Sequence, residues 1–163
     1  MDDIFTYREA KPYLQRTKRM LKSVHSLESY IEDTKKDLFE LEKIARKSSK
    51  KTAILSFVKK TRGNFEEEYD SYREKTEIAL SRAEKLYRKI TEAHKNIPNE
   101  MIRDILEYYY MDEHTIEDTA EHFAFSISSI SRYKKTGLMK MSELLFGIII
   151  DDKIDASLKL NIS

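Results

Sequence analysis

Residues 115–147, TIEDTAEHFAFSISSISRYKKTGLMKMSELLFG, decide how the C-terminal half of the chain folds. Thr115 followed three residues later by Asp118 is typical of a helix N-terminus. Ser126 can begin a second helix by accepting a hydrogen bond from a backbone N–H two or three residues on. The pattern therefore predicts two helices joined by a tight turn at residues 123–125. The apolar stripe of the second helix consists of Ile130, Tyr133, Leu138, Met141 and Leu145.

The second of these helices is basic outside its apolar stripe. Residues 126–141 contain four basic side chains and no acidic one, whereas Glu117, Asp118 and Glu121 make the first helix acidic. Such a pair is typical of a helix-turn-helix, whose second helix enters the major groove of DNA. We expect base-edge contacts from Ser128, Ser129 and Arg132, with Ser131 beside them, and phosphate contacts from Ser126, Lys134, Lys135 and Lys140. A helical hairpin with a solvated basic face would give the same pattern.

Residues 105–141, ILEYYYMDEHTIEDTAEHFAFSISSISRYKKTGLMKM, resemble the region-4-type helix-turn-helix of sigma factors. They resemble more closely the ArpU/RinA-like late-transcription regulators of phages that infect Gram-positive bacteria. The matching positions are Tyr110, Thr115, Asp118, Thr119, Ala120, Phe123, Phe125, Ser126, Ile130, Arg132, Leu138 and Met141. Thr119 stands where the family has a bulky aliphatic residue, and Ala124 stands where the turn usually has Gly. An Ala held at positive φ would cost about 1 kcal/mol.

The N-terminal stretch EAKPYLQRTKRMLKSVHSLESYI, residues 9–31, is similar to the coiled-coil half of the same family. The resemblance as a whole covers roughly residues 8–146. It implies activation of phage late genes by binding to DNA upstream of them, and it says less about direct contact with RNA polymerase.

The composition favours a helical protein of one domain, or of one domain with an appendage. The chain has 163 residues, of which 36% are charged, with only three Gly and two Pro to make turns. Its net charge is only +1, so any contact with DNA must be local. The absence of Cys excludes disulfides and thiol catalysis. No apolar run approaches the length of a membrane span and no signal peptide is recognisable, so we expect a cytoplasmic protein.

Apolar residues alternate at steps of four and three over most of the first 97 positions. The first series is Ala10, Tyr13, Thr17, Met20, Val24, Leu27, Ile31, Thr34, Leu38, Leu41 and Ala45, and the second is Phe65, Tyr69, Tyr72, Thr76, Ala79, Ala83, Leu86, Ile90, Ala93 and Ile97. Asn64 can cap the second series. We expect residues 10–47 to fold back on 65–95 as an antiparallel coiled-coil hairpin. A coil between two copies of the chain, giving a homodimer, fits equally well.

Three further segments border these elements. Residues 43–62 carry eight positive and no negative charges, and we expect a break in the helix at Ser48 and Ser49. This segment, the basic tip, is either a second contact with DNA phosphate or a solvated loop, and we favour the loop. Pro98 ends the second long helix, and Asn99 can cap the next. In the tail, residues 148–163, the apolar Ile148–Ile150 run should cover the module, extend its last helix or join a dimer contact.

Catalytic and metal chemistry has no clear signal in the sequence. The four histidines fall on separate elements; they are His25, His94, His114 and His122. His114 and His122 could approach each other, but no third ligand lies at the spacing that a metal site needs. The three glycines are isolated, so no glycine-rich loop is formed to hold a phosphate. We therefore expect neither an enzyme nor a cofactor.

The sequence predicts an all-α protein with three parts. These are an N-terminal coiled-coil hairpin at 8–97, a helix-turn-helix module at 98–147 and the tail. The expected function is sequence-specific binding of double-stranded DNA in transcription regulation, with RNA polymerase and a second copy of the chain as further candidate partners. Two alternatives are a small-terminase-like packaging protein, which a mass measurement would reveal as a large ring, and a module that docks on RNA polymerase without touching DNA.

Overall fold

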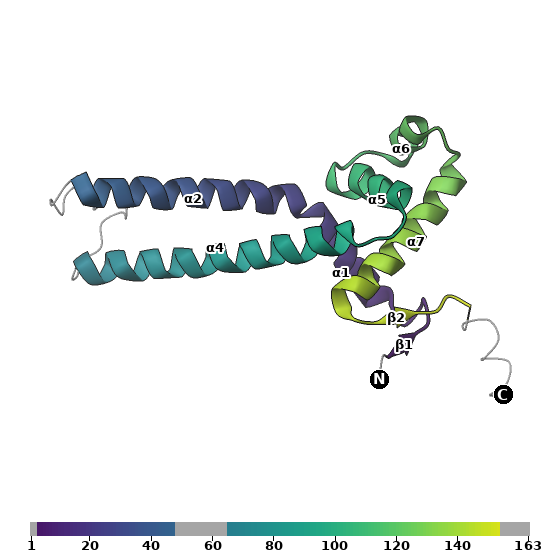
Figure 1. Ribbon diagram of the computed structural model, residues 1–163, viewed down its shortest axis with the longest axis horizontal. Coiled ribbons are helices and arrows are strands. Elements are labelled where there is room, and N and C mark those ends of the chain that lie inside the picture. The colour runs from purple at the N-terminus through teal and green to yellow at the C-terminus, as the bar shows by residue number, and fades with distance from the viewer. Residues whose placement is uncertain (1–2, 48–64, 154–163) are drawn as a thin grey trace. The chain divides into compact units, whose positions relative to one another are not determined.

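The chain is mostly helical, which agrees with the predicted all-α class. The computed structural model describes residues 3–47 and 65–153, and Figure 1 shows the elements of this part. It contains six α-helices, one π-helical turn and one pair of two-residue strands. In chain order these are β1 (Ile4–Phe5), α1 (Lys11–Lys22), α2 (Val24–Lys47), α4 (Phe65–Lys95), α5 (Glu100–Leu106), η1 (Glu107–Met111), α6 (Ile116–Phe123), α7 (Ile127–Phe146) and β2 (Ile149–Ile150).

The chain forms two compact units. The first combines Met1–His25 with Arg88–Ser163, and the second is Ser26–Tyr87. The first unit therefore contains α1 as well as every element from the end of α4 onward. This division differs from the predicted one, which grouped residues 8–97 and began the next domain at 98.

The difference arises at Ser23, where the predicted long helix is interrupted. α1 ends at Lys22 and α2 begins at Val24, so the prediction of one helix over 10–47 is wrong. The Ser23 hydroxyl donates to the carbonyl oxygen of Met20 over 2.7 Å, and its backbone N–H bonds to the same carbonyl at 3.2 Å. A serine that bonds the preceding turn in this way bends a helix.

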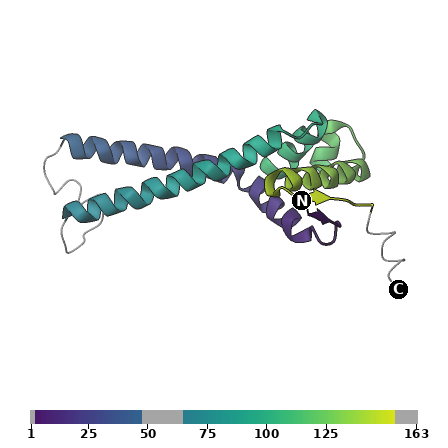
Figure 2. The same cartoon turned by 60° about the horizontal axis from the view of Figure 1, so that its bottom comes forward.

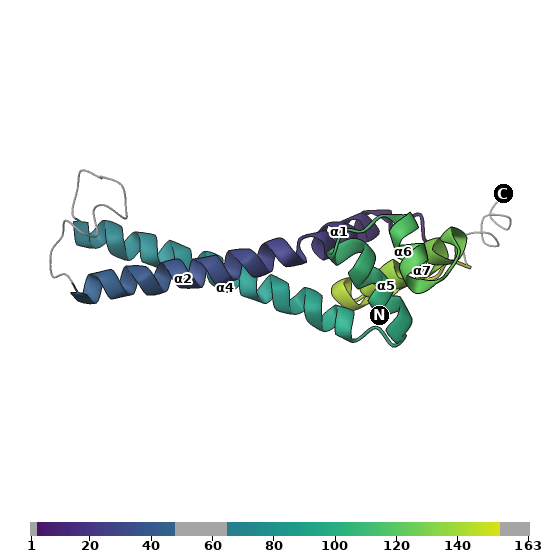
Figure 3. The same cartoon turned by 90° about the horizontal axis from the view of Figure 1, so that it is seen from above.

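The first unit is built around α7. α1, α5 and α6 all pack against it, as Figures 2 and 3 show. The two strands pair in parallel, with Ile4 opposite Ile149 and Phe5 opposite Ile150. The apolar residues after α7 thus cover the unit, which is one of the outcomes expected for them, since Ile150 is buried.

In the second unit, α2 and α4 run in opposite directions (Figure 1). Within this unit the buried side chains of α2 are Ile31, Thr34 and Leu41, all members of the predicted heptad series; Val24 at the start of α2 is also buried and belongs to the first unit. Lys35 on α2 forms a salt bridge with Glu84 on α4, with Nζ and Oε1 3.3 Å apart. The heptad pattern therefore identifies which face of α2 is buried.

Some of the predicted features lie outside the described part. The basic tip at 43–62 lies there from residue 48 onward, together with the break at Ser48 and Ser49 and the cap at Asn64. Residues 154–163 of the tail lie there too. Lys43, at the edge of the described part, is exposed near the end of α2.

Candidate nucleic-acid interface

Both helices of the 115–147 stretch begin at the predicted residues. The Thr115 hydroxyl accepts the backbone N–H of Asp118 over 3.1 Å at the start of α6, and the Ser126 hydroxyl accepts that of Ser129 over 3.2 Å at the start of α7. Asn99 caps α5 in the same manner, accepting from Ile102 over 3.2 Å. Each of the three caps satisfies one of the backbone donors that a helix start leaves without a partner.

The turn between α6 and α7 places an alanine, and not a glycine, in the left-handed region. Ala124 lies in the left-handed region, at φ 57° and ψ 41°. The backbone N–H of Phe125 bonds to the carbonyl of Ala120 over 3.0 Å, and that of Ala124 bonds to the carbonyl of Glu121 over 3.2 Å. This double closure is a Schellman motif, which ends a helix abruptly and redirects the chain.

A small apolar cluster holds α5, α6 and α7 together. Its buried centre takes one residue from each helix, namely Ile105, Ala120 and Ile130, and Phe125 of the turn packs against it. Gly137 lets α5 approach α7 closely, because a Cβ at this position would lie 2.8 Å from Cγ2 of Ile102 and 2.9 Å from Cδ1 of Leu106. The position of α7 on this platform is thus set by apolar packing, which leaves its opposite face free for polar residues.

The opposite face of α7 carries the serines and the arginine. Ser126, Ser128, Ser131 and Arg132 are exposed, and Ser129 is half-buried. Hydrogen bonds connect the first turn: the Ser126 hydroxyl donates to Ser129 over 2.9 Å, and Arg132 donates to the Ser129 hydroxyl over 3.4 Å. Within the first turn of α7 there is no acidic residue. The result is an exposed polar and cationic surface on one end of a helix.

The three lysines of α7 lie in other environments. Lys134 is half-buried, and its Nζ stands 3.6 Å from the centre of the Tyr109 ring, a cation–π contact. Lys135 Nζ forms a salt bridge with Asp152 Oδ2 over 2.9 Å. Lys140 Nζ lies 3.9 Å from a carboxylate one turn further along α7. All three predicted phosphate-contacting lysines therefore have an aromatic or carboxylate partner inside the first unit, whereas Arg132 on the outer face donates to the neutral Ser129 hydroxyl.

A second basic helix was not predicted as a candidate interface, because the heptad pattern assigned it to the coiled coil. α1 contains five basic and no acidic residues, and all five are exposed; they are Lys11, Arg16, Lys18, Arg19 and Lys22. The signal is present in the sequence as an acid-free run at 11–22. Its meaning depends on the packing of α1 against α7, which the run itself does not indicate.

The histidines take part in contacts within the first unit. Tyr108 lies between two of them, with its ring centre 3.8 Å from that of His114 and 4.2 Å from that of His122, and both pairs are stacked. His25 Nε2 lies 2.7 Å from Asp112 Oδ1. These contacts link η1 to α6 and to the start of α2.

Other kinds of site find little support. Within residues 3–47 and 65–153, no group of three His, Asp or Glu side chains could hold a metal ion. Among the helices described there, none is both long and apolar enough to cross a lipid bilayer.

Comparison with known proteins identifies no relative: no protein-family model, no curated protein and no solved structure matches this chain.

Proposed function

We propose that this chain is a sequence-specific DNA-binding regulator of transcription, in which α6 and α7 form a helix-turn-helix and α7 is the recognition helix. The observation that carries the proposal is the exposed Ser128, Ser131 and Arg132 face of α7, held outward by the buried cluster of α5, α6 and α7. A helix presented on a rigid platform, with hydroxyls and a guanidinium near its N-terminus, suits the major groove. The acidic α6 leaves α7 as the cationic member of the pair.

Arg132 is the side chain that we assign to base recognition. Its guanidinium can donate two parallel hydrogen bonds to one guanine, a pairing that discriminates against the wrong base by about 1–3 kcal/mol. Ser128 lies one turn earlier on the same face and can reach an adjacent base or phosphate. The partners of Lys134 and Lys135 make both residues secondary candidates, since their present contacts must be given up before they bind phosphate.

The remainder of the proposal follows the resemblance. The second unit is proposed to be an antiparallel coiled-coil hairpin, and the protein is proposed to activate phage late genes in the cytoplasm of a bacterial host. The buried heptad residues of α2 and the Lys35–Glu84 salt bridge support the hairpin.

Selection of bound duplexes from a random pool tests the function. Recovery of a common sequence element by the full chain is the expected result, and recovery of unrelated duplexes alone refutes sequence-specific binding. Arg132→Ala should then weaken binding to the selected duplex by about 1–3 kcal/mol and binding to random duplex far less. Arg82→Ala is the matched control, because Arg82 is an exposed arginine on α4 in the other unit. Equal losses for Arg132→Ala on both duplexes would remove Arg132 from base recognition.

A further inference from the structure

The charge of the chain changes abruptly at Ser23. α1, before it, carries five basic residues and no acidic one, whereas the first four turns of α2 already include Glu28, Glu32 and Asp37. An ordinary solvated helix mixes both signs, because opposite charges one turn apart stabilise it. α1 contains no acidic residue and therefore lacks the stabilisation that ion pairs along a helix provide. Its uniformly basic charge needs another explanation.

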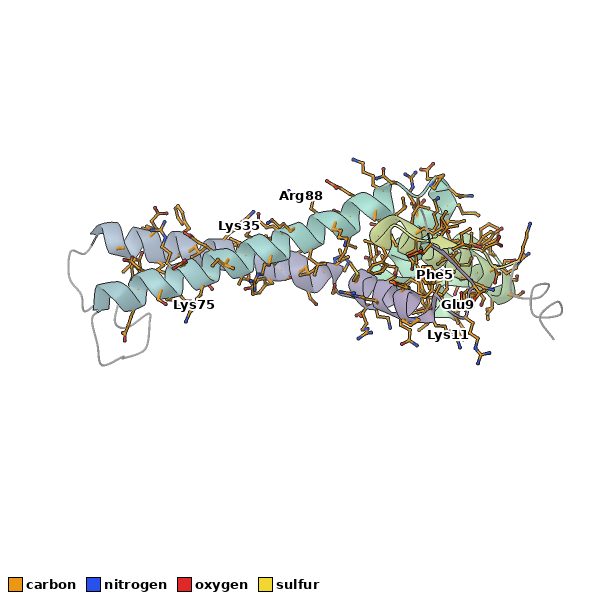
Figure 4. All side chains as sticks on the ribbon, turned by 90° about the horizontal axis from the view of Figure 1, so that it is seen from below. Phe5, Glu9, Lys11, Lys35, Lys75 and Arg88 are labelled. Carbon is orange, nitrogen blue, oxygen red and sulfur yellow. The ribbon has the colours of Figure 1, made fainter. Side chains whose placement is uncertain are left out.

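None of the five cations of α1 has an acidic partner among the described residues, although the guanidinium of Arg16 lies 5.6 Å from the centre of the Phe146 ring. In residues 3–47 and 65–153, no carboxylate lies within salt-bridge distance of Lys11, Lys18, Arg19 or Lys22. The nearest acid along the chain, Glu9, instead accepts a hydrogen bond from the backbone of Thr6. Figure 4 shows Lys11 pointing away from the ribbon of α1. These four side chains are available to an anion from outside.

The shape of α1 favours nucleic acid over a lipid surface. A helix that lies on a membrane needs a free apolar face. The apolar stripe of α1, with Leu14, Thr17 and Leu21, is already buried in the first unit. Lys11, Lys18 and Lys22 lie near one line along the helix, about 10 and 6 Å apart, so they can contact successive charges of an extended polyanion.

The place of α1 connects it to the proposed recognition helix. α1 packs against α7 in the same compact unit, and the side chain of Tyr7, just before α1, meets Lys135 of α7 with Nζ 4.3 Å from the ring centre. Lys135 is two turns along α7 from Ser128, about 10 Å. A duplex held at the N-terminal end of α7 therefore passes close to the beginning of α1.

We infer that α1 is a second DNA-contacting element, which binds the phosphate backbone through Lys11, Lys18 and Lys22 while α7 reads the bases. The inference rests on the proposed function. Phosphate contacts of this kind contribute affinity without sequence preference, because every duplex presents the same backbone. They would provide positive charge to the DNA in place of the α7 lysines, which contact other groups of the first unit.

The test compares two triple variants of the full chain. Lys11→Gln/Lys18→Gln/Lys22→Gln removes the three charges of α1, and Gln has nearly the helix propensity of Lys. Lys36→Gln/Lys75→Gln/Lys85→Gln is the matched control, which removes three exposed lysines from α2 and α4 in the other unit; Lys75 is labelled in Figure 4. Both variants should keep the far-UV circular dichroism of the parent.

Duplex binding is measured over a range of salt concentrations. The plot of log affinity against log salt concentration has a negative slope, and each lost phosphate contact makes it shallower by about 0.9. The slope of the α1 variant should therefore be about 2.7 shallower than that of the parent. Its loss of affinity relative to the parent should then shrink about 40-fold between roughly 50 and 200 mM salt. The deficit should be the same on selected and random duplexes. The control variant should keep the parent slope.

The possible outcomes distinguish a failure of the inference about α1 from a failure of the proposed DNA-binding function. If the parent binds a selected duplex and the α1 variant keeps the parent slope, α1 does not contact phosphate and the inference fails alone. It also fails alone if the α1 variant keeps its DNA affinity and loses affinity for RNA polymerase. If the parent binds no duplex at any salt concentration, the proposed function fails together with the inference.

Discussion

A buried hydrogen bond between α1 and α7 gives the sharpest test of how the first unit is assembled. The hydroxyl oxygens of Thr17 and Ser142 lie 2.6 Å apart, 125 residues distant in the chain, and both residues are fully buried. The single hydroxyl proton of Thr17 is donated to the carbonyl of Tyr13 over 2.8 Å. Ser142 must therefore be the donor to Thr17.

This assignment makes the two single substitutions unequal. Ser142→Ala removes the donor and leaves the proton of Thr17 in its bond, so the cost is that of one hydrogen bond, about 1 kcal/mol. Thr17→Val keeps the shape but takes away the acceptor, which leaves the Ser142 proton buried with no partner from α1 and costs about 1–3 kcal/mol. Replacing both at once removes the unpaired proton, so the double variant should cost about 1–2 kcal/mol less than the sum of the single variants.

Urea unfolding of the full chain, followed by far-UV circular dichroism, measures the four free energies of this cycle. Thr76→Val on α4 is the control, because the Thr76 hydroxyl makes the same bond to its own helix, to the Tyr72 carbonyl over 2.8 Å. The unfolding free-energy changes of Thr76→Val and Ser142→Ala should add up in the variant that carries both substitutions. Additivity within about 0.5 kcal/mol for the Thr17 and Ser142 pair would refute the docking of α1 on α7.

Three further predictions concern single positions. Ala124→Gly should raise the free energy of unfolding by about 1 kcal/mol, because the Cβ at φ 57° is disfavoured; a lower melting temperature would contradict this. Gly137→Ala should lower it by about 1 kcal/mol, since the clash with Ile102 and Leu106 exceeds the gain in helix propensity; a stabilised variant would contradict the close packing. Burial raises the pKa of Tyr110 above its ordinary 10.0, so folded Tyr110 stays neutral while the unfolded phenol ionises. Stability from this group is complete below pH about 10 and is lost as the pH rises above it, and Tyr110→Phe should reduce that alkaline loss in melting curves.

The starts of the C-terminal helices could be predicted from the sequence because their signals are local. Asn99, Thr115 and Ser126 each cap a helix through a bond three residues away, and no distant contact is needed for that. The exposure of Arg132 followed from the apolar stripe of α7 for the same reason.

The remaining features depend on contacts between distant segments. The series of apolar steps runs through Ser23 without interruption, so the pattern does not indicate that α1 leaves the heptad partner and packs on α7. The contacts of Lys134 with Tyr109 and of Lys135 with Asp152 depend on which elements meet in space. The π-helical turn at Glu107–Met111 and the β1–β2 pair likewise have no periodic signal of their own.

The pairing of β1 with β2 and of α1 with α7 determines when the first unit can form during synthesis. A ribosome that adds about 5–20 residues per second needs roughly 6–25 s to make the 125 residues between Thr17 and Ser142. Throughout that interval the nascent chain presents Leu14 and Leu21 without α7, although α2 and α4 are both made before α7. α1 is thus buried only after α7 has been made, and in the cell its apolar side is exposed to chaperones and proteases until then.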